Sequence, residues 1–139
     1  MPTPPDDICL NKGAIMERSI RRMREEFAHD PTLRNFTHID ALILNLERAC
    51  QAAIDLAMHL VARDHRGMPQ SSSDAFRLLA QAKVISEDCC RAMMAMTGFR
   101  NIAIHEYQAL DLTILKRIAT DDWRGLLVFA RECGLSLNP

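Results

Sequence analysis

Apolar residues recur at intervals of three and four positions through most of the chain. This is the repeat of an amphipathic α-helix, and no segment shows the period-two alternation of a half-buried β-strand. The pattern predicts helical stretches at about 8–29, from 37 to a stop at 64–69, from 71–74 to about 82, from 86 onward, and at about 111–133. We therefore predict an all-α fold, an up-and-down bundle of about five helices in a single domain over residues 1–139.

The second stretch is the most apolar of the five and is expected at the centre of the bundle. Its start, Thr37-His38-Ile39-Asp40, resembles a capping box. The positions expected to face the core in this stretch are Ile39, Leu42, Ile43, Leu46, Ala49, Cys50, Ala53, Ala57, Leu60 and Val61. In the last stretch they are Leu112, Leu115, Ile118, Ala119, Leu126, Phe129 and Ala130.

The charges are nearly balanced, with 17 Lys and Arg against 18 Asp and Glu and a formal net charge of -1. The chain therefore has no overall basic field of the kind that draws nucleic acid, and any such site must be local. A content of 48% hydrophobic residues excludes a disordered tail or a fibrous repeat. In the first stretch, oppositely charged residues such as Glu17 and Arg21 are four apart and are expected to pair on a solvated face.

The cysteines and the lack of targeting signals favour a reducing compartment. Cys9, Cys50, Cys89, Cys90 and Cys133 are odd in number and lack C-x-x-C spacing, so we expect buried free thiols. The first residues are acidic and proline-rich, unlike a signal peptide, and no run of about 18 apolar residues would cross a membrane. We predict a cytoplasmic protein with no membrane partner.

Most motifs of cofactor and metal chemistry are missing from the sequence. There is no glycine-rich phosphate loop, and His105-Glu106 lacks the second histidine of a zinc-protease helix. The other histidines have no ligand spacing, so we predict no metal and no cofactor. Glu47 and Asp55 lie two turns apart on a mostly apolar stretch, where a charged group is more often a cap or a salt-bridge partner than part of an acid–base pair.

The segment 98–107 carries the most informative polar residues. On a helical wheel, the apolar stripe that contains Met96 continues into Arg100 and Tyr107. Asn101 and His105 lie one turn apart on the neighbouring line. A helix end that simply reaches solvent gives the same pattern, because the helix dipole favours Arg and His there. Taken alone, the spacing leaves that interpretation and a functional site both open.

Residues Arg100-Asn101-Ile102-Ala103-Ile104-His105 resemble the signature of the HEPN superfamily: an arginine, four to six residues of which the first is polar, then a histidine. Tyr107, two residues after the histidine, matches the HepT-like branch of that superfamily. The resemblance also covers 43–55 and 69–72, in the family's order. These relatives are toxin ribonucleases that are paired with a minimal nucleotidyltransferase (MNT) antitoxin.

The resemblance implies the toxin of a type VII toxin–antitoxin system, a metal-independent endoribonuclease. Its substrate would be RNA, with tRNA as one candidate, and not DNA. Arg100 and His105 would be catalytic: histidine is suited to moving the 2′-OH proton, and a guanidinium can stabilise charge growing on the phosphate. Asn101 would support catalysis by orienting the imidazole or holding the substrate.

The resemblance also implies a homodimer. Arg100 and His105 are five residues apart, about 140° round a helix, so one helix does not easily aim both at a single phosphate. A two-fold dimer that brings together the motifs of both subunits would remove this difficulty. We expect the stripe with Met93 and Met96, and the fourth helical stretch as a whole, to contribute to the interface.

Tyr107 has a separate implied role, adenylylation by the MNT-type nucleotidyltransferase antitoxin, which would silence the nuclease. It lies two turns beyond Arg100 on the same line, so an attached nucleotide would place phosphate charge near that arginine. A second candidate function is a catalytically silent HEPN module that binds nucleotide or regulates a partner. A third is a plain helical interaction domain. Neither alternative predicts a nuclease activity that depends on His105.

Overall fold

The computed structural model describes residues 3–105 and 110–139, with the backbone alone at 105. The elements along this part of the chain are α1 (Asp7–His29), α2 (Phe36–Arg63), α3 (Ser72–Gln81), α4 (Glu87–His105), α5 (Leu112–Arg117), the π-helical segment η2 (Ile118–Asp122) and α6 (Arg124–Glu132). The all-α prediction is confirmed, with six α-helices in the described residues where about five were expected.

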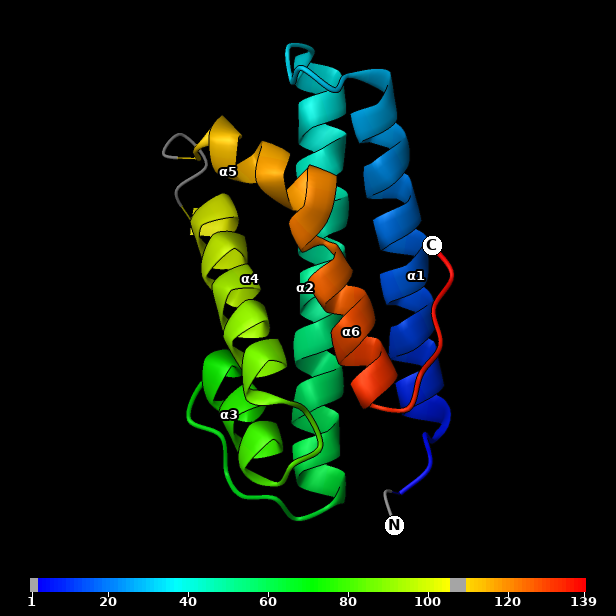
Figure 1. The fold of residues 1–139 in the computed structure, drawn as a ribbon, viewed down its shortest axis with the longest axis vertical. Coiled ribbons are helices and arrows are strands. Elements are labelled where there is room, and N and C mark those ends of the chain that lie inside the picture. Colours follow the sequence, from blue (N-terminus) through cyan, green and yellow to red (C-terminus); the bar gives the residue numbers. More distant parts are fainter. Residues whose placement is uncertain (1–2, 106–109) are drawn as a thin grey trace.

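Helix α2 forms the centre of the bundle, as predicted. It runs antiparallel to α1, and α3, α4 and α6 also pack against it (Figure 1). Helix α4 returns alongside α2, α5 crosses the end of the bundle, and the C-terminal segment runs back along α1 (Figure 1). Every position expected to face inward from α2 is buried. The two longest helices thus support one face of the bundle, and α4 is held between α3 and α6.

Polar side chains at the helix starts explain where the helices begin. The Asp6 carboxylate accepts from the backbone N–H of Cys9 (2.9 Å), and Ser71 Oγ accepts from that of Asp74 (3.1 Å). The predicted cap at Thr37 is wrong. Helix α2 begins earlier because Asn35 Oδ1 accepts from the backbone N–H of Thr37 (2.9 Å), which makes Asn35 the capping residue.

The last predicted helix is broken into two, which corrects the expectation of one helix from 111 to 133. In η2 the backbone N–H of Trp123 donates to the carbonyl of Ile118 (3.0 Å), an i to i+5 bond. The hydroxyl of Thr120 donates to the carbonyl of Lys116 (2.7 Å). Leu112 is 45% exposed, contrary to prediction, because α5 crosses the end of the bundle instead of continuing the line of α6. The other six predicted positions are buried.

All five cysteines are free thiols, as expected, and four of them are buried. Burial raises the pKa of Cys50 and of Cys89 to about 12, so both stay protonated and unreactive at neutral pH. The adjacent Cys89 and Cys90 are both buried and pack in the core. Within the described part of the chain, no helix has the length and apolar character needed to cross a membrane.

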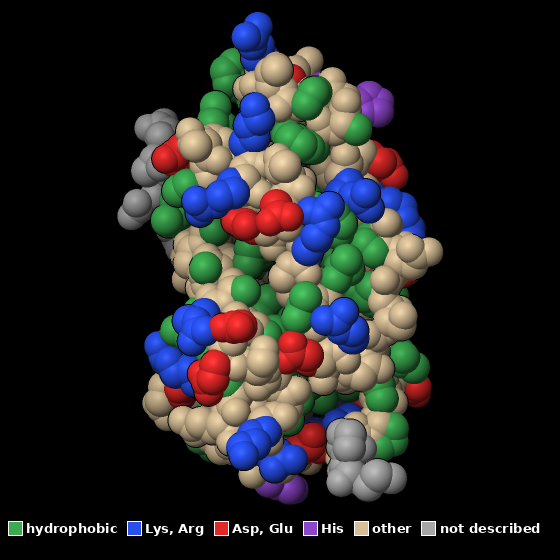
Figure 2. Space-filling model, in the orientation of Figure 1, with side chains coloured by type: hydrophobic (Ala, Val, Ile, Leu, Met, Phe, Trp, Pro, Cys, Tyr) green, Lys and Arg blue, Asp and Glu red, His purple; other side chains and the backbone are tan. Residues whose placement is uncertain are grey.

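Positive and negative side chains are mixed on the face of the molecule that Figure 2 shows. On the face shown in Figure 2, Lys and Arg side chains lie beside Asp and Glu side chains and form no continuous basic patch. Arg21 lies 4.0 Å from Glu17 on α1, which confirms the pairing expected there. On this face the arrangement agrees with the balanced composition.

Candidate functional site

The methionine stripe that precedes the Arg100 motif on α4 faces the core of this chain. Met93 and Met96 are 1% and 4% exposed, so the expectation that they form part of a dimer interface is wrong. Helix α4 turns this side toward its own neighbours in the bundle. Its outward side carries the small residues Ala92, Ala95 and Gly98. A Cβ placed on Gly98 would meet no atom within 4 Å, so this side of α4 is open.

Arg100 is half-buried near the C-terminal end of α4, with its guanidinium against α2. Its Nη2 donates to Oε1 of Gln51, and its Nη1 donates to Oδ1 of the adjacent Asn101 (3.2 Å). The Nε atom is buried and has no hydrogen-bond partner among the described residues. The guanidinium is thus held by amide oxygens and keeps unused donors.

Gln51 belongs to a chain of contacts that joins three helices. Its Nε2 donates to Oδ1 of Asp55 (2.8 Å), one turn further along α2. The other carboxylate oxygen of Asp55 accepts from Nζ of Lys12 on α1 (3.3 Å). The expectation that Asp55 is a salt-bridge partner is therefore confirmed. Through these contacts, residues of α1 and α2 together hold the Arg100 side chain of α4 in place.

The charge of Arg100 acts on two groups of α2. Partial burial raises the pKa of Glu47, and the positive charge of Arg100 works in the opposite direction. Cys50 lies in the core. Burial raises the pKa of its thiol, and the positive charge of Arg100 offsets part of that rise. The guanidinium therefore lies where its field is only partly screened by water.

The structure describes only some of the remaining motif residues. Asn101 is exposed and contacts Arg100. His105 is the last residue of α4, so its backbone position is known while its side chain lies outside the description. Tyr107 lies outside the described residues. The structure thus brings Arg100 and Asn101 together at the end of α4, and the roles of His105, Asn101 and Tyr107 remain predictions.

Sequence reasoning did not single out Gln51. The signal was nevertheless present, because Glu47, Gln51 and Asp55 recur every four residues on a mostly apolar helix. Residues four apart share one side of a helix, so the three form a polar line along α2. Such a line inside a bundle indicates polar partners on a neighbouring helix.

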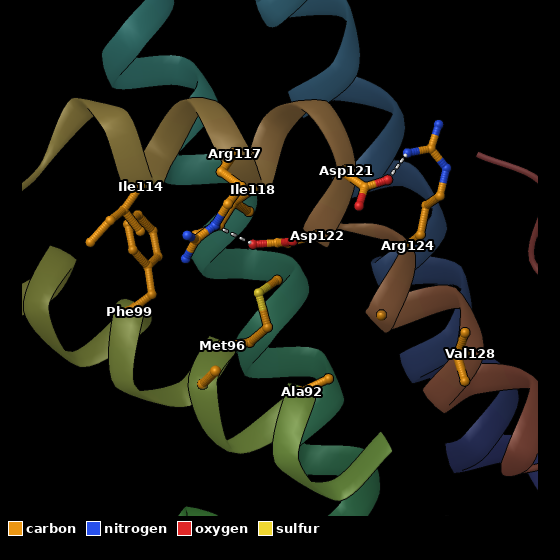
Figure 3. Close-up of a pocket in the computed structure, with 12 residues that line it drawn as sticks. Ala92, Met96, Phe99, Ile114, Arg117, Ile118, Asp121, Asp122, Arg124 and Val128 are labelled. Carbon is orange, nitrogen blue, oxygen red and sulfur yellow. Dashed lines mark hydrogen bonds and ion pairs between the residues drawn. The ribbon is translucent and has the colours of Figure 1, made fainter. Parts of the chain in front are cut away.

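A groove of about 580 Å³ lies on the other side of the α4 motif, between α4, α5, η2 and α6 (Figure 3). Its floor is apolar and includes Met96, Phe99 and Ile118. Ion pairs at its rim join Arg117 to Asp122 (3.2 Å) and Arg124 to Asp121 (2.9 Å). Arg100 does not line the groove, so the groove and the Arg100 cluster are separate features.

One group of potential metal ligands occurs in the described residues: Asp6, Cys9 and His59, with donor atoms within 4.8 Å of one another. His59 Nε2 lies 2.7 Å from the Asp6 carboxylate. Arg63 places Nη1 3.4 Å from that carboxylate and 3.7 Å from Cys9 Sγ. A cationic side chain therefore already neutralises the site that a metal ion would share. The cluster ties the start of α1 to the end of α2.

Comparison with known proteins agrees with the motif. The sequence matches the family described as ribonuclease HepT-like over residues 16–133. It is 40% identical over 114 residues to the mRNA nuclease HepT of Shewanella oneidensis, which covers 81% of this chain and 86% of that protein.

Solved structures give the same result over almost the whole chain. A toxin–antitoxin complex with AMP-PNP matches with a TM-score of 0.88 and 35% identity, covering 93% of this chain and 99% of that chain. A tri-AMPylated Shewanella oneidensis HEPN toxin in complex with an MNT antitoxin matches with a TM-score of 0.89 and 36% identity, covering 94% and 98%. This chain therefore belongs to the HepT-like ribonucleases.

Proposed function

We propose that this chain, acting as one domain, is the toxin of a type VII toxin–antitoxin pair and cleaves RNA without a metal ion. The observation that carries the proposal is the state of Arg100, five residues before His105 on α4. Among the described residues, its guanidinium donates to neutral amide oxygens, and Nη1 and Nη2 each carry a second N–H group. Its charge is therefore available to a phosphate, which binds guanidinium through paired hydrogen bonds.

The proposed reaction is attack of the RNA 2′-oxygen on the adjacent phosphorus. The imidazole of His105 accepts the 2′-OH proton while the new bond from the 2′-oxygen to phosphorus forms. Arg100 stabilises the negative charge that grows on the phosphate oxygens. The bond from phosphorus to the 5′-oxygen breaks, the 5′-oxygen takes up a proton, and a 2′,3′-cyclic phosphate remains. DNA lacks the 2′-OH, so it is not a substrate.

The direct test is incubation of total RNA with the purified protein in excess EDTA, after mass measurement has shown the protein to be unmodified. Cleavage that leaves 2′,3′-cyclic phosphate and 5′-OH ends, and that is lost in His105→Ala, is expected. Intact RNA both in EDTA and in a parallel incubation with Mg²⁺ would overturn the proposal and favour the silent, nucleotide-binding module. Cleavage that stops in EDTA would contradict metal independence.

A second copy of the chain is proposed to pack against the outward side of α4. Ala92 and Ala95 are exposed there, and both line the apolar groove. Gly98 continues this open side toward the motif. Small side chains allow two helices to approach closely, and the adjacent apolar groove offers surface to bury. Packing here would bring the C-terminal ends of the two α4 helices, which carry the motif, close to one another.

Replacing Ala95 with arginine is expected to convert the dimer to a monomer and to remove RNA cleavage, because a long charged side chain would enter the proposed interface. Light scattering after gel filtration measures the mass, and the RNA assay measures the activity. Ala14→Arg, an equivalent change on the exposed side of α1, is the matched control and should leave both unchanged. A dimeric, active Ala95→Arg protein would show that the subunits pair elsewhere.

An MNT-type nucleotidyltransferase is the proposed antitoxin, and Tyr107 is the proposed site that it adenylylates. The support is the tri-AMPylated Shewanella toxin bound to an MNT antitoxin, together with the position of Tyr107 two residues after His105. An attached nucleotide brings a negatively charged phosphate into the neighbourhood of Arg100, where it would compete with RNA.

Replacing Tyr107 with phenylalanine is expected to leave RNA cleavage within about twofold of wild type, because phenylalanine lacks only the hydroxyl that accepts the nucleotide. The variant should remain active after incubation with the cognate nucleotidyltransferase, Mg²⁺ and ATP, while wild type loses activity. Intact-mass measurement follows the added nucleotides. Equal silencing of both proteins would place the modification on another residue.

A further inference from the structure

The contact between Gln51 and Arg100 joins residues 49 positions apart in sequence. It is made by the side-chain oxygen of Gln51, which accepts from Nη2 of Arg100. The amide nitrogen of the same side chain donates to Asp55 (2.8 Å). Gln51 therefore uses both ends of its amide group at once.

The carboxylate of Asp55 sets the direction of that amide group. An ionised carboxylate only accepts hydrogen bonds, so it faces the nitrogen of Gln51 and leaves the oxygen directed at Arg100. Asp55 is in turn held by Lys12, 3.3 Å away on α1. If the amide were reversed, its NH₂ group would face the guanidinium and the contact would be lost.

An amide oxygen is suited to orienting an arginine that must bind another anion. A carboxylate at position 51 would form a paired salt bridge with the guanidinium and would compete with a phosphate. The oxygen of Gln51 instead fixes the plane of the guanidinium and leaves its full charge in place. Asn101 contacts Nη1 through a second amide oxygen (3.2 Å), which limits rotation of the group further.

We propose that Gln51 is a positioning residue that orients Arg100 toward the scissile phosphate, with Asp55 and Lys12 holding Gln51 in the required direction. The inference rests on the proposed ribonuclease function, because it assigns Gln51 a part in that reaction through Arg100. Gln51 touches no reacting atom in this assignment.

The test is a double-mutant cycle between Gln51 and Arg100. Gln51→Leu is expected to lower kcat for RNA cleavage about tenfold or more, the effect of losing one hydrogen bond to a charged group, with a smaller change in KM. In an Arg100→Ala background the same change should have no further effect, because Gln51 acts only through Arg100. Gln81→Leu, the same substitution at an exposed position of α3, is the control for leucine itself.

Charge and orientation are separated by Gln51→Glu. This variant retains an oxygen acceptor for Arg100 but adds a negative charge, and we expect kcat to fall although the Arg100 contact is kept. The melting temperature should fall modestly as well, because the new carboxylate no longer donates to Asp55 and repels it. A kcat for Gln51→Leu equal to that of the Gln81→Leu control would overturn the inference. An equal loss in the wild-type and Arg100→Ala backgrounds would also overturn it, since Gln51 would then act elsewhere.

A second measurement does not depend on cleavage. The ¹⁵N NMR signal of the Arg100 Nε–H group, assigned by its loss in Arg100→Ala, should shift or broaden in Gln51→Leu and stay in place in Gln81→Leu. An unmoved signal would contradict the positioning role even in an active enzyme. If wild type cleaves no RNA, the proposed function fails, and this signal still decides whether Gln51 orients Arg100.

Discussion

Replacing His105 with alanine is expected to lower the rate of RNA cleavage by about 10²–10⁴-fold, the usual contribution of a general acid–base residue. Alanine favours helix, and the substitution falls at the last residue of α4, so the fold should be retained. The measurement is the single-turnover rate constant on a defined RNA at saturating protein. The melting temperature and helical circular dichroism of the same sample show whether the bundle is intact.

The control for this variant is His29→Ala, which removes an exposed histidine from the corresponding end of α1. It should cleave RNA at the wild-type rate. A His105→Ala protein that retains a tenth or more of the wild-type rate would remove His105 from the chemistry. Proton transfer would then have to be assigned to another group, although the fold and the family would be unaffected.

Replacing Arg100 with alanine is expected to lower the rate about 10²–10³-fold, the effect of removing one donor that stabilises transition-state charge. Arg100→Lys should recover only part of this loss. Lysine carries the same charge but presents it as a point on a flexible stem, without the planar fork that contacts Gln51 and Asn101. Single-turnover rates at several salt concentrations separate the lost chemistry from weaker RNA binding.

Arg77→Ala provides the comparison on another helix. Arg77 is exposed on α3 and pairs with Asp74 (3.9 Å), so its loss removes an arginine without touching the Arg100 cluster or the outward side of α4. It should retain the wild-type rate. If Arg100→Lys is as active as wild type, the geometry of the guanidinium has no part in catalysis, and a simple positive charge is enough.

The helices up to α4 could be predicted because local signals agree with the apolar period. Ser71 and Ser86 lie before α3 and α4 and cap them, as the sequence indicates. The start of α2 was misplaced because Thr37 and Asn35 are both good capping residues. Only the observed bonds from Thr37 and His38 to Asn35 identify the one that is used.

The break in the last helix was not predictable from periodicity. Leu115 and Ile118 before the break, and Leu126 and Phe129 after it, all fit an inward-facing helical pattern. One extra residue in a turn shifts the inward-facing positions by about 100°. The apolar residues of this segment are numerous enough to fit the pattern with or without that shift. The sequence therefore predicts the helices on both sides of the break, but it does not predict the break or the angle between them.

The candidate site was predictable where the motif is local and not where it depends on packing. Arg100 and His105 were proposed because one local stretch resembles the HEPN signature, and their catalytic roles remain predictions. Gln51 was missed because its partner is on a different helix, and only the packing of α2 against α4 brings them together. The stripe with Met93 and Met96 was assigned to an interface because an apolar stripe does not specify which surface covers it.

The shape of the groove depends on the number of residues in the π-helical turn at Ile118–Asp122. Deleting one residue within this turn would allow an unbroken α-helix. The residues of α5 would then be rotated by about 100° relative to α6. Leu115 would leave the core, and the groove wall formed by Ile114 and Arg117 would turn away with it. Relatives that differ here by a single inserted or deleted residue would therefore present a different surface beside the same α4 motif.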